Sequence, residues 1–328
     1  MNRRESIAAF LALAAVATPL GAQVQKSGRT PRVGILILAS LPSVARVIDG
    51  MRSSLRELGY VEGRSIIIEI VSAEGNAERL PGLAEQLVAR KVDVIVTGGG
   101  NVSTIAARKA TSTIPIIMTS SIGAVEAGLV QSLARPGGNI TGLTVPRDLA
   151  FKQIELLREL VPSVARIAVL VRHDLAMVEL RRQVKELVQQ LMLVTLEYFE
   201  ARSPEDLPRA LEAARATKPD AVIVAPDPLL YQQREQILRF TRAARLPDMH
   251  TAPDMVEAGG LIAYGPNAED IFRGVTRFVD RLLKGAKAAE LPVEQPTKFA
   301  LAINLKTAKA LGLTIPQSVL VRAEQVVE

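Results

Sequence analysis

The stretch VDVIVTGGGN at residues 92–101 combines a short apolar run, a glycine-rich turn and a residue type that begins helices. An apolar run without polar alternation predicts a strand over 92–96 that is buried on both faces. Asn101 predicts the cap of a helix over 101–110. Because a buried strand followed at once by a helix is the unit of a parallel sheet covered by helices, this stretch predicts an α/β fold.

The same alternation continues on both sides of this stretch. Strands are predicted at 33–38, 65–71, 114–118 and 140–145, and helices at 43–58, 76–90 and 148–160. Apolar runs joined by helices are typical of parallel sheets that carry helices on both faces.

The second half of the chain repeats the order of the first. The matches are RVGILI (32–37) with RIAVLV (166–171), Leu80-Pro81 with Leu207-Pro208, and Asp93 with Asp220. The last two pairs share one spacing of 127 residues. Any doubly wound domain contains such strings, but three in the same order indicate two copies of one unit. We therefore expect two doubly wound parallel-sheet lobes.

Turn residues mark three places where the chain is expected to cross between the lobes. They are the segment 135–139 with the strand after it, the segment 264–267, and the segment 291–296. Proline and glycine fix or free the backbone there, which suits a three-segment hinge. The predicted bounds are 32–144 plus 267–291 for lobe 1 and 145–266 plus 297–328 for lobe 2.

The N-terminus has the order of a secretory signal peptide. Arg3 and Arg4 precede an apolar run over 7–17, and small residues follow at 19–22. This order predicts a signal peptide over 1–22, cleaved near Ala22, although an N-terminal core helix and a choice between general and twin-arginine export remain open. The chain has no cysteine, so it forms no disulfide and carries no lipid on cysteine. We expect a periplasmic protein without direct membrane insertion.

Composition argues against several other classes of protein. The net charge of +6 is spread over mixed charges without a basic block, and aromatic residues make up 3% with no tryptophan. Nucleic-acid binding is therefore not expected. His173 and His250 are the only histidines, neither stands in a metal-ligand spacing, and there is no cysteine nucleophile or nucleophile elbow. We expect a monomer that is not an enzyme, with no catalytic residue, metal or cofactor.

Small and hydroxyl-bearing residues follow the predicted strands. In the first half they are Ser40, Gly99, Gly100, Asn101, Thr119 and Ser120. Helix N–H groups at Asn101 suit an anion, while the alternative is a plain tight turn with a cap. Asp227 follows a strand of the second half, and Tyr264 precedes a crossing. Because parallel strands present their carboxyl ends to the cleft, these residues are candidates for a ligand site.

Five segments resemble the ABC transporter substrate-binding protein family related to tryptophan/tyrosine-type uptake receptors. They are LRELGYVEG (55–63), SLARPGGNITGL (132–143), EAGGLIAYG (257–265), LPVEQPTKF (291–299) and INLKTA (303–308). The resemblance implies a type I periplasmic-binding-protein fold and delivery of a small-molecule ligand to an ABC permease in the inner membrane. By position, it also implies ligand contacts at Ser40, Gly99 to Asn101, Thr119, Ser120, Asp227 and Asn267.

One loop departs from that family. Relatives often carry an Asp-Pro pair where this chain has Gly123-Ala124. Without that carboxylate, the resemblance favours a small polar or anionic metabolite in the interlobe cleft over an amino acid. A ligand-sensing module for a membrane receptor, without transport, is the alternative function.

Overall fold

The computed structural model describes residues 29–146, 148–174 and 177–328, with the backbone only at residues 268–269. Residues 31–328 form one compact unit. The predicted signal peptide over 1–22 lies outside the described residues. In the part of the chain that is described, no helix has the length and apolar character needed to cross a membrane.

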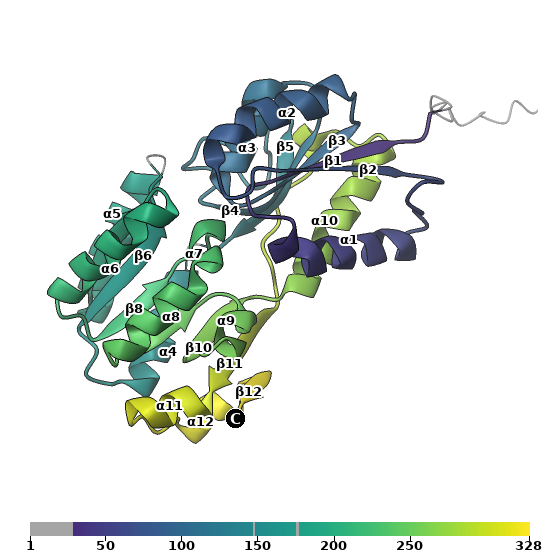
Figure 1. Ribbon diagram of the computed structural model, residues 1–328. Helices are drawn as coiled ribbons and strands as arrows, with labels where there is room; N and C mark the ends of the chain where they lie inside the picture. The colour runs from purple at the N-terminus through teal and green to yellow at the C-terminus, as the bar shows by residue number, and fades with distance from the viewer. Residues whose placement is uncertain (1–28, 147, 175–176) are drawn as a thin grey trace, which may run out of the picture. The chain divides into compact units, whose positions relative to one another are not determined.

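The first sheet has the strand order β2-β1-β3-β4-β5, and all its described neighbours pair in parallel. Its elements are β1 (Arg32–Ile37), η1 (Pro42–Val44), α1 (Ala45–Glu57), β2 (Ile67–Ser72), η2 (Ala77–Arg79), α2 (Leu80–Ala89), β3 (Val94–Gly98), α3 (Asn101–Ala110), β4 (Ile116–Ile122) and β5 (Ile140–Val145), joined later by α10 (Ala268–Leu283) and η5 (Ala288–Glu290). Helices α2 and α3 cover one face, and α1 and α10 cover the other (Figure 1).

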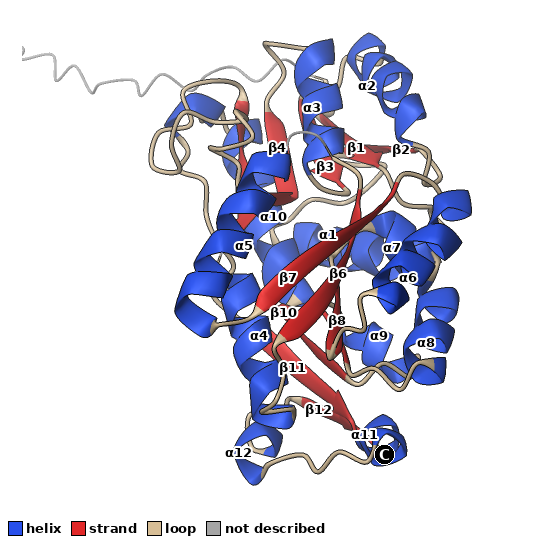
Figure 2. Ribbon diagram, turned by 90° about the vertical axis from the view of Figure 1, so that its left-hand side faces the viewer, coloured by secondary structure: helices blue, strands red, loops and turns tan. Residues whose placement is uncertain are grey.

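The second sheet has the order β12-β11-β10-β9-β8-β6-β7. Its elements are α4 (Leu149–Leu160), β6 (Arg166–Arg172), α5 (Val178–Met192), β7 (Thr195–Ala201), η4 (Pro204–Asp206), α6 (Leu207–Ala216), β8 (Ala221–Val224), α7 (Pro228–Gln232), α8 (Arg234–Ala243), β9 (Asp248–His250), α9 (Pro253–Glu257), β10 (Ile262–Pro266), β11 (Phe299–Asn304), α11 (Leu305–Leu311), α12 (Gln317–Leu320) and β12 (Gln325–Val327). The strands run between two layers of helices (Figure 2). The predicted α/β fold with two parallel-sheet lobes is confirmed, and we use "first lobe" and "second lobe" for these two sheets with their helices.

One pairing in the second sheet departs from the parallel pattern, because β11 is antiparallel to β10. Strand β10 ends at Pro266, where the chain leaves for α10 of the first lobe. The chain returns at the same edge, so that Phe299 at the start of β11 pairs with Pro266 at the end of β10. The direction of β11 thus follows from where the third crossing enters the sheet.

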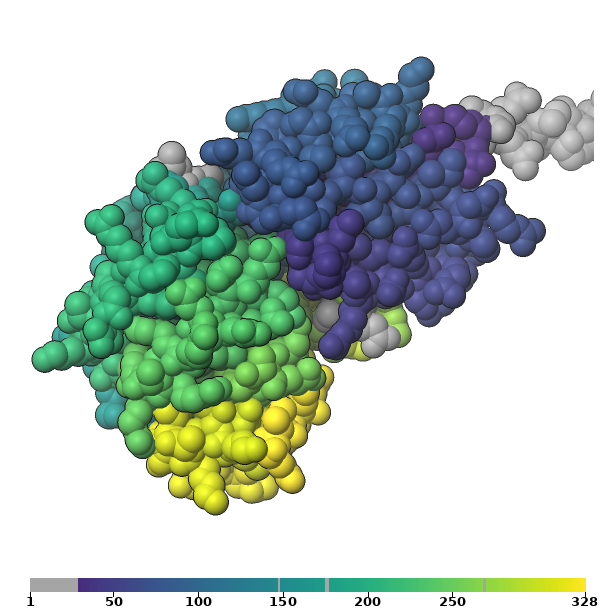
Figure 3. All heavy atoms as spheres, viewed as in Figure 1, coloured from purple at the N-terminus to yellow at the C-terminus, as the bar shows by residue number. Residues whose placement is uncertain are grey.

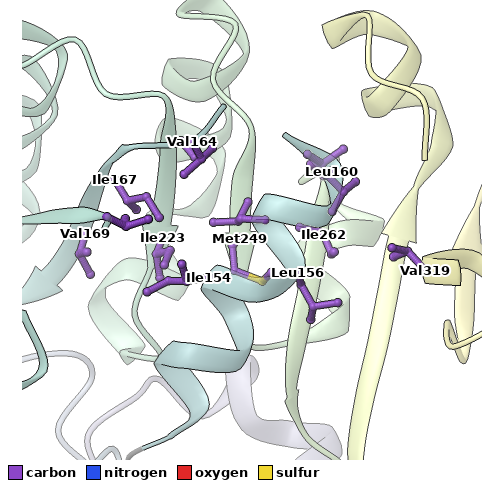
Figure 4. Close-up of a cluster of buried hydrophobic side chains, with 14 of the residues drawn as sticks. Ile154, Leu156, Leu160, Val164, Ile167, Val169, Ile223, Met249, Ile262 and Val319 are labelled. Atoms are coloured by element: carbon purple, nitrogen blue, oxygen red, sulfur yellow. The ribbon is translucent and has the colours of Figure 1, made fainter. Parts of the chain in front are cut away.

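Alternation along β6 explains why its sequence is apolar throughout. Ile167 and Val169 pack into a cluster with α4, whereas Ala168 and Leu170 pack with α6 and α7 on the opposite face. Successive side chains of a strand point to opposite faces, so a sheet covered on both sides needs apolar residues at every position. Figure 4 shows Ile154 of α4 lying over this first cluster.

The internal repeat corresponds to a shared local structure. The carboxylate of Asp93 accepts a hydrogen bond from the N–H of Arg32 at 2.7 Å, at the start of β1. The carboxylate of Asp220 accepts one from the N–H of Arg166 at 2.8 Å, at the start of β6. Each Leu-Pro pair likewise begins the helix that precedes its aspartate. The two halves therefore share the same hydrogen bond, from the N–H at the start of one strand to the aspartate that precedes the neighbouring strand.

The three crossings follow β5, β10 and the segment after η5. Val145 is still part of β5, and Glu294 still bridges to Leu143 of that strand. We therefore propose that the first lobe comprises 32–145 plus 267–294, slightly more than the predicted 32–144 plus 267–291. The predicted second lobe, 145–266 plus 297–328, accordingly begins after Val145.

Candidate functional site

A cavity of about 210 Å³ has walls from both lobes. The first lobe contributes the start of α3 and the end of β4, and the second contributes the ends of β6 and β8 with α4 and α5. Parallel sheets bring their carboxyl ends and the following helix N-termini to one edge, which is why these segments meet. We take this cavity as the candidate functional site and call it the interlobe cavity.

Charged groups enter the interlobe cavity from the second lobe. Arg172, the last residue of β6, has its Nη1 atom fully buried and without a hydrogen-bond partner among the described residues. Asp227 follows β8 and caps α7 by accepting a hydrogen bond from the N–H of Leu229 at 2.8 Å. Asp174 lines the same wall. Arg181 of α5 lines it as well, so two cations and two carboxylates line one small cavity.

Burial raises the pKa of Asp227 above its usual range, and the positive charge of Arg172 and the N–H groups of Leu229 and Leu230 offset only part of that effect. The carboxylate is thus incompletely compensated within the protein. A ligand cation placed beside it would stabilise its charged form. Tyr198 also lines the cavity, and burial raises its pKa to about 12, so its hydroxyl stays neutral.

The first-lobe wall depends on two glycines. Gly99 and Gly100 have φ values of 103° and 81°, a region that side chains disfavour. A Cβ atom on Gly99 would also lie 2.5 Å from Cβ of Leu38. These residues turn the chain sharply from β3 into α3, so that the N-terminal end of α3, where N–H groups have no partner within the helix, lines the interlobe cavity.

Ser120 and Asn101 differ in whether their side chains are already engaged. The Asn101 amide donates to the carbonyl of Ile122 at 2.9 Å and accepts from the N–H of Ile122 at 3.1 Å. It also lies 3.2 Å from the sulfur of Met177 in the second lobe. Ser120 lines the cavity with no hydrogen bond from its hydroxyl to the described residues. Asn101 therefore holds the wall together, and Ser120 is available to a ligand.

Replacing these two residues by alanine should separate stability from binding. Asn101→Ala leaves both backbone groups of Ile122 unpaired and should lower the free energy of unfolding by about 2–4 kcal/mol. Ser120→Ala should change it by less than about 0.5 kcal/mol but weaken ligand binding roughly tenfold. Urea unfolding and calorimetric titration of both variants check this, and a stability loss in Ser120→Ala as large as in Asn101→Ala would contradict the assignment.

The four remaining predicted residues, Thr119, Ser40, Tyr264 and Asn267, do not line the interlobe cavity. Thr119 lies at its edge, beside Ser120. The Thr119 hydroxyl donates to the carbonyl of Thr97 at 2.9 Å. The backbone carbonyl of Ser40 accepts hydrogen bonds from both the N–H and the hydroxyl of Ser43 in η1. Two residues belong to the crossings. Tyr264 stacks on Phe299 with ring centroids 5.6 Å apart, and Asn267 accepts a hydrogen bond from the N–H of Asp270 at the start of α10.

A second cavity, of about 260 Å³, adjoins the first and is almost wholly apolar. The two share Gly99 and Ser120. Its other lining residues come from β1 and the segment after it, η1, α1, β3, Thr119 of β4 and α10, with Pro228 from the second lobe. Figure 3 shows the segment around α7, in green, against the segment that begins α1, in purple. We call this second space the apolar chamber.

Gly123 and Ala124 do not line the interlobe cavity, although Ile122 directly before them does. They line a larger groove of about 600 Å³ beside the crossings. A Cβ atom on Gly123 would lie 2.8 Å from a methyl carbon of Leu180, so the glycine allows α5 of the second lobe to approach. The carboxylates that the cavity does contain come from the second lobe, where Asp174 and Asp227 line its wall.

Sequence reasoning missed Arg172, although one signal pointed to it. Residues just after a parallel strand lie at the cleft edge of the sheet, and this position indicated Asp227. Arg172 directly follows the predicted strand 166–171, so the same position also indicates Arg172. No three metal-ligating residues lie together among the described residues. Nε2 of His250 lies 3.3 Å from a carboxylate oxygen of Asp248, and both side chains are buried in the second lobe and do not line the interlobe cavity.

Comparison with known proteins places these features in a family. The profile of the family described as ABC transporter substrate binding protein matches residues 32–327. A tyrosine-binding protein from Clostridioides difficile (strain R20291) is 27% identical over 289 residues, which are 88% of this chain and 82% of the relative.

Two solved structures are 28% identical to this chain and cover 91% of it and 100% of their own chains. One is the ABC domain in complex with L-Trp from Streptococcus pneumoniae, with a TM-score of 0.82. The other is a conserved domain protein from Vibrio cholerae O1 biovar eltor, with a TM-score of 0.83. The likeness extends over nearly all the described residues.

Proposed function

Because this chain belongs to the ABC transporter substrate binding protein family, with its type I periplasmic-binding fold, we propose that it is the periplasmic receptor of an ABC importer. In this role it binds a small molecule between its lobes and delivers it to a membrane permease. The observation that carries the proposal is the interlobe cavity, whose charged and N–H-bearing walls come from different lobes. A ligand there contacts both lobes and so favours the form in which they are closed.

The ligand class that fits best is an α-amino acid with an aromatic or large apolar side chain. Asp227 suits the ammonium group of such a ligand, and the start of α3 suits polar or negative atoms. At about 210 and 260 Å³, the two spaces are small, which suits a ligand of amino-acid size. The relatives that bind tyrosine and L-Trp support the same class. We therefore favour an amino acid over the uncharged or anionic ligand that Gly123-Ala124 indicated.

Transport is tested with the protein beside its permease. Proteoliposomes that contain the cognate permease and ATPase are supplied with this protein, with and without L-tyrosine. We expect ATP hydrolysis to rise severalfold only when protein and ligand are both present. Ligand binding without any stimulation would contradict the transport role and favour a ligand-sensing module.

A further inference from the structure

Arg172 is the cation in the interlobe cavity whose hydrogen bonds remain incomplete. Its Nη1 atom is buried and unpartnered among the described residues. Arg181, the neighbouring cation in the cavity wall, is already engaged, because its Nη1 lies 2.6 Å from Glu200 and its Nη2 donates to the carbonyl of Arg172 at 2.7 Å. The protein thus satisfies the guanidinium of Arg181 but leaves Nη1 of Arg172, which also lines the interlobe cavity, without an acceptor among the described residues.

A buried charged donor without an acceptor lowers stability, so its retention needs a compensating partner. The guanidinium fork matches the geometry of a carboxylate and can bind both of its oxygens. Asp227 provides the opposite charge in the same wall, and the positive charge of Arg172 acts to lower the pKa of its carboxyl group. Arg172 and Asp227 together therefore match a zwitterion.

We propose that Arg172 binds the α-carboxylate of the ligand, so that the second lobe holds both charged groups of the amino-acid head. This inference rests on the proposed function and adds the requirement for a free α-carboxylate. The first lobe then closes on the head with Ser120 and the start of α3. The second lobe thus supplies both charged partners of the ligand head, and the first lobe completes its enclosure.

The test is a double-mutant cycle in which one change is made at residue 172 and the other removes the α-carboxylate of the ligand. Calorimetry measures the affinities of L-tyrosine and of tyramine, which lacks the carboxylate, for the wild-type protein and for Arg172→Met. In the wild type, tyramine should bind about 10- to 100-fold more weakly, because Arg172 stays unpaired. In Arg172→Met, the two ligands should differ by less than about threefold. L-tryptophan and tryptamine form a second pair.

Two further variants guard the interpretation. Arg166→Met removes the arginine at the opposite end of β6 and should leave the full tyramine penalty in place. Arg172→Lys keeps the charge but has one ammonium in place of the guanidinium fork, so it should retain part of the discrimination between L-tyrosine and tyramine. It replaces Arg172→Met in the test if that variant folds poorly. An equal tyramine penalty in the wild type and in Arg172→Met would overturn the inference while leaving the proposed function standing. Failure of the wild type to bind any proteinogenic amino acid would overturn both the inference and the proposed ligand class.

Discussion

Gly99→Ala is expected to lower the free energy of unfolding by about 4 kcal/mol, the largest effect of any single methyl group in the site. Gly99 has a φ of 103°, which costs an alanine about 1–3 kcal/mol. The new Cβ atom would also lie 2.5 Å from Cβ of Leu38. Both atoms are bonded directly to the backbone and cannot rotate away, so overpacking adds about 1–3 kcal/mol. Urea unfolding measures the loss.

Gly100→Ala is the matched control. Gly100 belongs to the same turn and has a φ of 81°, but a Cβ atom there has nothing within 4 Å. It should cost only the backbone strain, about 2 kcal/mol. If both variants lose the same stability, close approach of β1 and the turn does not determine the shape of the cavity wall.

Asp227→Asn is expected to weaken binding of L-tyrosine by about 100-fold, or roughly 3 kcal/mol, because the ligand ammonium loses its buried counter-charge. Stability of the free protein should not fall. Asparagine caps helices as well as aspartate does, so the hydrogen bond from the N–H of Leu229 is kept. Calorimetric titration and thermal unfolding of the same sample measure the two effects.

The pH dependence gives a second readout for Asp227. Burial raises its pKa in the folded protein, so the folded state binds a proton more readily than the unfolded state. Its carboxylate therefore opposes folding above the raised pKa, and this destabilisation is relieved as the pH falls through that pKa. Over the same range, binding of L-tyrosine should weaken as the carboxyl becomes neutral. Asp227→Asn should remove this pH dependence, and its persistence in the variant would assign it to another group.

Much of the fold could be predicted because it depends on local pattern. The two-sided burial of β1, β3 and β6 requires apolar residues at each position, and that pattern is visible in the sequence. The spacing of Asp93 and Asp220 reflects a hydrogen bond that each makes to the start of a neighbouring strand. The direction of β11 could not be predicted, because it depends on where a crossing enters a sheet.

The site was less predictable, because position after a strand does not say whether a side chain is free. Gly99, Gly100, Asn101, Ser120 and Asp227 do line the interlobe cavity. Yet the amide of Asn101 is engaged by Ile122, a contact between residues that are 21 positions apart. Ser40, Tyr264 and Asn267 instead serve local turns and crossings. Such partners depend on tertiary packing, which residue type and spacing do not determine.

Hydrogen exchange with and without L-tyrosine tests most directly whether the ligand lies between the lobes. Slower exchange is predicted in both 99–104, at the start of α3, and 225–231, at the start of α7. These segments belong to different sheets, so joint protection requires a ligand or a closure that involves both. No change is expected in the helix surface 187–191, which lies beyond the cavity. Protection confined to one sheet, or centred on the groove around 123–126, would contradict the account.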